Sequence, residues 1–164
     1  MNSKYTPLSR TLHWLGALSI FTILTLGFMM VFADSREVKH YSEAAHIGVG
    51  FFVFFIVAWR IVLRFYQGFP ESTTTVKDKL VRYLHYALLL TMLVLIVTGP
   101  LYLFTENDPL SVFGWFSVSM DLSGLPWLHE PSEEIHKVLG TYVLPVLVTL
   151  HIAGGVWHFY KEKD

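Results

Sequence analysis

Residues 138–160, VLGTYVLPVLVTLHIAGGVWHFY, run for 23 positions without an Asp, Glu, Lys or Arg. Residues 11–33 and 83–105 are equally long and also uncharged, and residues 44–59 form an uncharged stretch that continues past Arg60 to residue 63. A helix needs about 20 apolar residues to cross about 30 Å of hydrocarbon. The sequence therefore predicts an all-α, four-helix transmembrane bundle, with spans at about 11–33, 44–63, 83–105 and 137–160.

A soluble bundle of buried helices is the alternative to membrane spans. Such helices normally keep one charged face, and these stretches have none. The first span does not resemble a signal peptide, because it is too long and no small-residue cleavage site follows it. We expect residues 1–164 to form a single integral-membrane domain.

The composition agrees with a membrane protein and excludes several classes of function. Hydrophobic residues make up 53% of the chain and charged residues only 15%, with a mean hydropathy of +0.48. A net charge of −1 without a basic cluster argues against binding nucleic acid. The absence of cysteine excludes disulfides, thiolate metal sites, iron–sulfur clusters and cysteine nucleophiles. Eight histidines remain as the main source of chemistry.

The basic residues predict the orientation in the membrane. Nine of them lie before the first span, around the connection between the second and third spans, or after the last span: Lys4, Arg10, Arg60, Arg64, Lys77, Lys79, Arg82, Lys161 and Lys163. Arg36, Lys39 and Lys137 lie on the other side, which also carries nine carboxylates. Positively charged loops favour the cytoplasm, so both termini are predicted to be cytoplasmic.

The histidines of the spans fall at two depths. An ionisable side chain within a membrane span is costly and indicates a functional site. His136 begins the fourth span on the outer side, and His151 follows 15 residues later, a rise of about 22 Å towards the cytoplasm. His46, at the outer start of the second span, is the predicted partner of His136. His13, at the cytoplasmic start of the first span, could pair with His151 or His158.

The remaining histidines have simpler interpretations. His85 lies at the cytoplasmic start of the third span, whereas His40 and His129 lie in outer loops, where solvation is expected. The long outer loop, residues 106–134, is too apolar for a free linker and is expected to lie on the bilayer interface. Whether it is only a lid or also shapes a substrate entrance stays open.

Imidazoles paired across a helix bundle suit a b-type haem, whose iron takes one nitrogen from each side. A zinc or manganese site usually adds carboxylates or thiolates, which these spans lack. Four histidines have a glycine one helical turn later, where a porphyrin needs clearance: Gly16 after His13, Gly50 after His46, Gly140 after His136 and Gly154 after His151. Close helix packing is the other use of such glycines. The pattern favours His46/His136 for an outer haem and His13/His151 for an inner one.

Four groups of residues carry a resemblance to a known family. They are Tyr5-Thr6-Pro7-Leu8 leading to His13-Trp14, Ala45-His46-Ile47-Gly48, Arg60-Ile61-Val62-Leu63-Arg64, and the series His136, Gly140, His151 and His158. In this order and spacing the chain resembles the bacterial dihaem cytochrome b561 family. The resemblance covers all four spans, while the outer loop 106–134 does not obviously match.

The resemblance implies a multi-pass protein of the bacterial cytoplasmic (inner) membrane with two haem b groups, bound by His13/His151 and by His46/His136. A studied family member is a superoxide oxidase that passes electrons to ubiquinone near the cytoplasmic face. By that resemblance, His85 and His158 are quinone-site residues. A quinone that gains two electrons must also gain two protons, which histidines can supply. Arg82, three residues before His85, is expected to hold a quinone carbonyl or a haem propionate.

The predicted function is transmembrane electron transfer from superoxide to quinone, an oxidoreductase activity. The acidic outer face would repel an anion unless Arg36, Lys39 or Lys137 offsets it. One alternative is a cytochrome b anchor subunit that takes electrons from a partner in a larger hydrogenase- or dehydrogenase-type complex. Another is a metal or proton transporter lined by histidines.

Overall fold

The computed structural model describes residues 7–67 and 75–161. The helices are α1 (Pro7–Phe32), α2 (Arg36–Gln67), α3 (Val76–Thr105), a 3-10 turn η1 (Pro126–Leu128), α4 (His129–Val138), a π-helical turn η2 (Leu139–Val143) and α5 (Leu144–Lys161). Four helical stretches are long and apolar enough to cross a membrane, which confirms the predicted all-α fold: Leu8–Phe32, Arg36–Tyr66, Val76–Thr105 and Pro126–Lys161. The described residues also include a short antiparallel hairpin of β1 (Leu110–Val112) and β2 (Phe116–Val118), which the sequence analysis does not predict.

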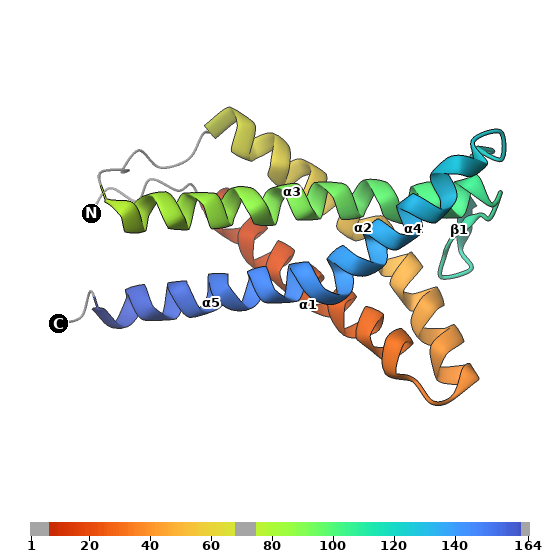
Figure 1. The fold of residues 1–164 in the computed structure, drawn as a ribbon, viewed down its shortest axis with the longest axis horizontal. Coiled ribbons are helices and arrows are strands. Elements are labelled where there is room, and N and C mark those ends of the chain that lie inside the picture. Colours follow the sequence, from red (N-terminus) through yellow and green to blue (C-terminus); the bar gives the residue numbers. More distant parts are fainter. Residues whose placement is uncertain (1–6, 68–74, 162–164) are drawn as a thin grey trace.

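The four spans alternate in direction (Figure 1). One end of the bundle holds the starts of α1 and α3 and the ends of α2 and α5. We call it the terminal end. The opposite end carries the β-hairpin and the start of α4, and we call it the hairpin end. The side of the membrane that each end faces remains a prediction from the basic residues.

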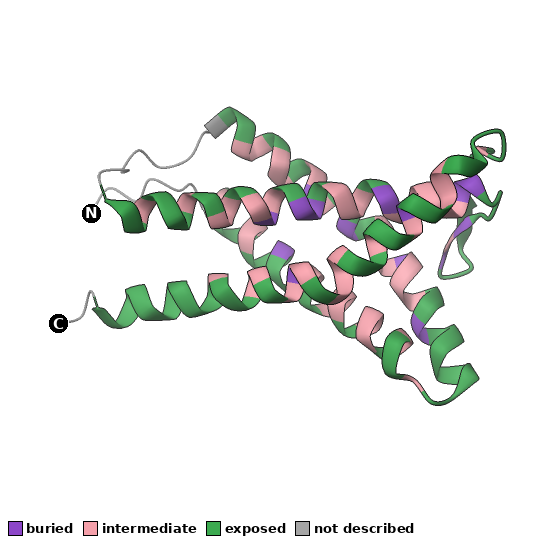
Figure 2. Cartoon of the chain, viewed as in Figure 1, coloured by how far each residue is buried: buried purple, intermediate pink, exposed green. Residues whose placement is uncertain are grey.

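Most apolar side chains of the bundle face outwards. In the most apolar windows of α1 and of the fourth span only 6% of residues are buried, and in those of α2 and α3 22% (Figure 2). Large side chains such as Phe65 are almost fully exposed. Apolar surface of this extent is stable in lipid and not in water. The chain is a multi-pass membrane protein.

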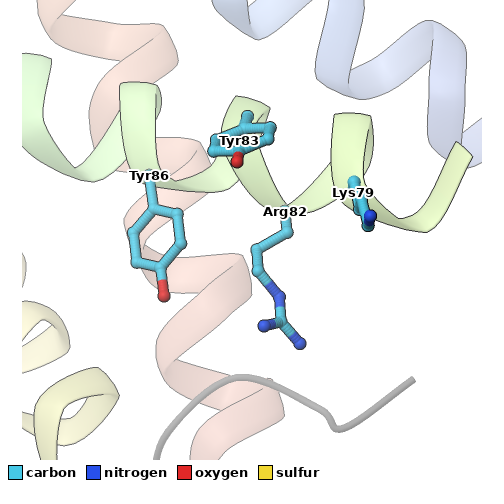
Figure 3. Close-up of a pocket in the computed structure, with 4 residues that line it drawn as sticks. All are labelled: Lys79, Arg82, Tyr83 and Tyr86. Atoms are coloured by element: carbon cyan, nitrogen blue, oxygen red, sulfur yellow. The ribbon is translucent and has the colours of Figure 1, made fainter. Parts of the chain in front are cut away.

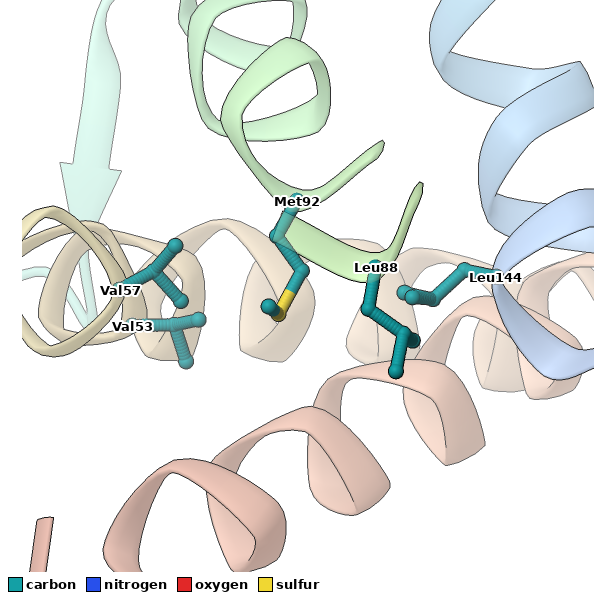
Figure 4. Packing of buried hydrophobic residues seen from close by; sticks show 5 residues of the cluster. All are labelled: Val53, Val57, Leu88, Met92 and Leu144. Carbon is teal, nitrogen blue, oxygen red and sulfur yellow. The ribbon is translucent and has the colours of Figure 1, made fainter. Parts of the chain in front are cut away.

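The buried core is small and joins three helices at mid-bundle. Val53 and Val57 of α2 meet Leu88 and Met92 of α3, and Leu144 closes the cluster from the start of α5 (Figure 4). Hydroxyl groups along the helices donate to the carbonyl four residues earlier, as in Ser19, Thr22, Thr25, Thr98 and Thr149. These bonds satisfy the hydroxyls where lipid offers no partner.

Local signals extend the helices beyond the predicted spans. α3 begins at Val76 because Thr75 and Asp78 form a capping box, with bonds of 3.2 and 3.3 Å. It ends at Thr105, as predicted, where Asn107 takes a left-handed φ of 60° and Asp108 N–H donates back to Leu103 O. The fourth span begins at His129 instead of 137, because α4 precedes the uncharged stretch.

The fourth span bends between its two histidines. The π-helical turn η2 separates α4 from α5, and the two helices differ visibly in direction (Figure 1). Pro145 follows directly and has no N–H to bond to the preceding turn. A π turn holds about one residue more than an α turn, so it changes the face that α5 presents to the bundle.

The β-hairpin packs on α2 through its buried strand β1, through Phe116 against Phe51, and through Phe113 in the turn. Phe113 and Gly114 occupy the turn with φ of 52° and 74°, and Trp115 N–H donates to Val112 O at 2.9 Å. A left-handed φ is costly for phenylalanine. It places the ring over Gly48, where an added Cβ would lie 2.7 Å from a Phe113 ring carbon. Gly48 therefore makes room for one of the residues that hold the hairpin on α2.

We predict that Gly48→Ala loosens the hairpin without unfolding the bundle, because the new methyl group displaces the Phe113 ring while the contacts of Val112 and Phe116 remain. Hydrogen exchange of the amides in residues 110–118 should accelerate at least tenfold, while exchange in α3 stays unchanged. Gly124→Ala is the control, since nothing lies within 4 Å of a Cβ at Gly124. Unchanged protection of the hairpin in Gly48→Ala would show that Phe113 does not help to hold it on α2.

Candidate functional site

Four histidines of the spans form two pairs across the bundle. At the hairpin end, His46 of α2 and His136 of α4 have ring centroids 6.2 Å apart and ring planes at 83°. At the terminal end, His13 of α1 and His151 of α5 have centroids 6.1 Å apart and planes at 72°. The structure thus brings together the same partners that the depth argument and the glycines favour.

A third imidazole lies beside the terminal-end pair. The ring of His85 in α3 is 5.0 Å from that of His151, and its Nδ1 donates to Val81 O at 2.7 Å. His158 is exposed, seven residues beyond His151 on α5. His151 therefore has two imidazole neighbours, His13 and His85. The ring spacing that a metal site requires decides which of them is its partner.

Thr98 of α3 controls the ring of His136. Its hydroxyl donates to Val94 O at 2.8 Å, so its oxygen accepts from His136 Nδ1 at 3.3 Å. That hydrogen bond assigns the proton of a neutral His136 to Nδ1 and leaves the lone pair on Nε2. In the partner ring, His46 Nδ1 is buried and has no hydrogen-bond partner among the residues of the structure.

Two glycines on neighbouring helices make room for this pair. An added Cβ at Gly99 of α3 would lie 2.9 Å from His136 Cε1, and one at Gly27 of α1 would lie 3.6 Å from His46 Cε1. The sequence analysis missed both, because it considered only glycines on the same helix as each histidine. Their depth, near the outer ends of the first and third spans, was the available signal.

The terminal-end pair has a different neighbour. Arg60 of α2 donates from Nη2 to His13 Nδ1 at 2.8 Å, and its Nη1 lies 3.5 Å from His13 O. Arginine is a donor only, so Nδ1 of His13 is the acceptor in this contact, and a neutral His13 can bind a metal through Nε2 only if Arg60 releases Nδ1. The space beside Gly16 holds this guanidinium, since an added Cβ would lie 3.1 Å from Arg60 Nη1.

The other predicted glycines differ in how closely they are packed. An added Cβ at Gly50 would lie 3.4 Å from Ile23, and one at Gly140 would lie 3.9 Å from Leu95. Nothing within 4 Å faces Gly154. A substitution at Gly154 would therefore meet no neighbouring side chain of this chain.

The interpretation of His129 as a solvated loop residue was wrong. His129 begins α4, and its Nδ1 lies 3.1 Å from Tyr102 O and 3.2 Å from Thr105 Oγ1. Its Nε2 lies 3.2 Å from Glu106 Oε1. His129 thus joins the start of α4 to the end of α3. His40 lies in α2 and is exposed.

A pocket opens at each end of the bundle. At the terminal end, Lys79, Arg82, Tyr83 and Tyr86 line a space of about 370 Å³, with Arg82 and Tyr86 extending from the same side of α3 (Figure 3). At the hairpin end, the start of α2 and the β-hairpin enclose about 560 Å³, lined by residues that include His40, Glu43 and Phe113. His85 is not among the lining residues of the first pocket.

The model of the family described as prokaryotic cytochrome b561 matches residues 4–164. The chain belongs to this family. It is 26% identical over 165 residues to the Escherichia coli (strain K12) protein "Cytochrome b561 homolog 2", a match that covers 98% of this chain and 87% of that protein. It is therefore a membrane cytochrome b561 involved in electron transfer, and the family implies haem b.

The imidazole pairs of this cytochrome fit the geometry of haem. A metal–imidazole bond is about 2 Å long and the ring centre lies roughly 1 Å behind the nitrogen, so two axial rings have centroids about 6 Å apart. His46/His136 and His13/His151 match this spacing, whereas His85 and His151 are too close. In residues 7–67 and 75–161 no three His, Cys, Asp or Glu side chains converge on one ion.

We predict that Gly99→Ala lowers the haem content of the purified protein. The added methyl group overlaps the edge of the His136 ring and moves it away from His46. Haem per chain, measured from the pyridine haemochrome spectrum, should fall by about half. The control Gly124→Ala should keep the full haem content. Full haem content in Gly99→Ala would show that His136 does not need the absence of a side chain at Gly99.

We also predict that His129→Ala loosens α4 from α3. It removes hydrogen bonds that are each worth about 1 kcal/mol, the one to exposed Glu106 less. The thermal midpoint in detergent should fall by a few degrees, and His40→Ala should leave it unchanged. Equal midpoints for both variants would show that His129 does not stabilise the contact.

Proposed function

We propose that the chain is a dihaem b-type cytochrome that carries electrons across the bacterial inner membrane, from a small donor at the hairpin end to ubiquinone at the terminal end. The observation that carries the proposal is the presence of two imidazole pairs, one towards each end of the bundle, with centroid spacings of 6.2 and 6.1 Å. A single pair would bind one electron carrier. Two pairs form a series along the membrane normal.

His46 and His136 would hold one haem, and His13 and His151 the other. When bound, the two haems would supply reversible one-electron carriers. The role of the chain is to hold four neutral imidazoles at fixed spacing and to exclude water from them. Gly140 and Gly154 would allow close approach of the macrocycles to the π turn and α5, whereas the space beside Gly16 is taken by Arg60 and that beside Gly50 by Ile23.

The hairpin end would face outwards and the terminal end the cytoplasm. Arg60, Arg64 and the basic residues of the first turns of α3 lie towards the terminal end, as cytoplasmic anchors do. Glu43 and Glu106 lie towards the hairpin end. The charge distribution over the described part of the chain thus supports the predicted orientation.

Superoxide is the proposed donor on the basis of the family resemblance. The pocket of about 560 Å³ beside the start of α2 would be its approach to the His46/His136 pair. One lining residue, Glu43, is unfavourable for an anion. Lys137 does little to offset it, because its Nζ pairs with Glu133 Oε1 at 2.7 Å.

The quinone would bind at the terminal end, with His85 and His158 as proton donors. His85 lies beside the inner ligand pair, and because its Nδ1 is bonded to Val81 O, proton exchange takes place at Nε2. Arg82 and the two tyrosines of the neighbouring pocket offer donors for a quinone carbonyl. Arg82 is the residue we assign to that carbonyl.

The haem count tests the proposal directly. Purified protein should show a Soret band with reducible α and β bands and two haems per chain. His46→Ala and His13→Ala should each remove about half of the haem, because each takes one ligand from one pair. The exposed residue His40 provides the control, and His40→Ala should keep both haems. One haem per chain, or none, would overturn the proposal.

Superoxide as donor has its own test. Stopped-flow mixing with superoxide should reduce the oxidised wild-type protein faster than it reduces the oxidised His46→Ala variant. Glu43→Gln should accelerate reduction about twofold to threefold at low ionic strength, because it removes a repulsive charge, and the gain should vanish in high salt. No reduction beyond the control would exclude superoxide. A stoichiometric partner retained in mild detergent would favour the alternative function as a cytochrome b subunit of a larger complex.

A further inference from the structure

We infer that one face of α3 is a binding site for an anionic phospholipid, whose phosphate group is bound by Lys79 and Arg82. The site begins in the terminal-end pocket of Figure 3 and continues along the lipid-facing surface of the helix. Its binding chemistry requires neither haem nor electron transfer. The inference therefore goes beyond the proposed function and can fail independently of it.

The pocket offers two positive charges and two phenols. Its lining residues are Lys79, Arg82, Tyr83 and Tyr86, around a space of about 370 Å³. Arg82 is half-buried and Lys79 is exposed. None of these four residues carries a negative charge that would neutralise the pair. Arginine and lysine are the residues that bind phosphate oxygens most strongly, through charge-assisted hydrogen bonds.

The pocket residues belong to a longer stripe on α3. Each residue of an α-helix turns its successor by about 100°, so positions 79, 82, 83, 86, 90, 93 and 97 fall within roughly 100° of arc. The stripe beyond Tyr86 is apolar and open to lipid, because Leu90, Leu93 and Val97 are 63%, 39% and 52% exposed. From Lys79 to Val97 the stripe extends about 27 Å along the helix axis.

The order of side chains along this stripe matches the order of groups in a phospholipid. Two cations lie nearest the terminal end, two phenols follow, and aliphatic side chains complete the stripe. A phospholipid has a phosphate at the membrane surface, ester carbonyls below it, and then acyl chains. The phenol groups can donate to the ester carbonyls. A free phosphate ion would use only the cationic part of the stripe.

The position of the pocket supplies a source for such a lipid. Basic residues at the ends of membrane helices lie at the depth of the headgroups, and anionic lipids gather beside them. Lys79 and Arg82 lie near the start of α3, at the end of the bundle that is predicted to face the cytoplasm. A bound lipid would therefore enter sideways from the bilayer.

The site overlaps the proposed quinone site at Arg82. A quinone also combines a polar head with an apolar tail, but its carbonyls are neutral and do not require a second positive charge. Binding of a phosphate group uses the charges of both Lys79 and Arg82. An anionic lipid bound here would compete with quinone, and the dependence of binding on Lys79 distinguishes the two ligands.

Native mass spectrometry of the purified full-length holoprotein tests the inference. The protein in detergent is titrated with phosphatidylglycerol and, separately, with phosphatidylcholine of the same acyl chains. One phosphatidylglycerol per chain should bind severalfold more tightly than phosphatidylcholine. Lys79→Gln and Arg82→Gln should each weaken binding of phosphatidylglycerol about threefold to tenfold, and should leave binding of phosphatidylcholine unchanged.

A matched control separates a site from general attraction to basic residues. Lys77→Gln removes the same charge from an exposed residue on the other side of α3, outside the pocket, and should leave binding of phosphatidylglycerol unchanged. Equal weakening by Lys77→Gln and Lys79→Gln would overturn the inference, as would equal affinity of the wild type for the two lipids.

Inorganic phosphate serves as the third ligand in the titration. A large excess of it should displace little of the bound phosphatidylglycerol, because phosphate lacks the acyl chains that contact the apolar part of the stripe. Complete displacement would assign the pocket to a free phosphate ion and overturn the lipid site. A wild type with one haem per chain would instead overturn the proposed function and leave these binding results unaffected, so the two failures are distinguishable.

Discussion

Within a bilayer every polar group must find its partner inside the protein, and this constraint explains most of the structure. Hydroxyls of the helices bond back to their own carbonyls, and the imidazoles of the spans meet in pairs. An isolated imidazole in hydrocarbon would be costly, whereas two that face one another at the spacing of a bis-imidazole metal site would bind an ion between them. The apolar side chains are left to face lipid, which is why only eight hydrophobic residues of the described chain are buried.

Different helices contribute the histidines of the two pairs. Under the proposed function, α1 and α2 would each supply one ligand, at opposite ends, and the fourth span would supply the other two through His136 and His151. α3 supplies no proposed ligand, yet Thr98 and Gly99 shape the hairpin-end pair and His85 adjoins the terminal-end pair. Each pair is thus held by its own two helices and adjusted by a third, which allows the two ends to differ chemically within one small bundle.

The sequence predicted the spans and the partners of the pairs, because both follow from the position along a helix. Uncharged length revealed the spans, and the 15 residues between His136 and His151 revealed two depths. Thr98, Gly99 and Gly27 were not found, since their roles depend on which side of a neighbouring helix faces the ring. His129 was misassigned because nothing in its own stretch shows that the end of α3 lies opposite. The β-hairpin depends on Phe113 accepting a left-handed φ, which sequence patterns predict only for glycine and asparagine.

The number of residues between His136 and His151, which includes the π turn, determines two quantities. That number sets a distance along the membrane normal, and it also sets an angle, since each residue of an α-helix turns its successor by about 100°. Removing a single residue from Leu139–Val143 would shorten the span only slightly, yet it would rotate the whole of α5 and carry His151 away from His13. The length of Leu139–Val143 is therefore fixed by the two rings that the segment connects.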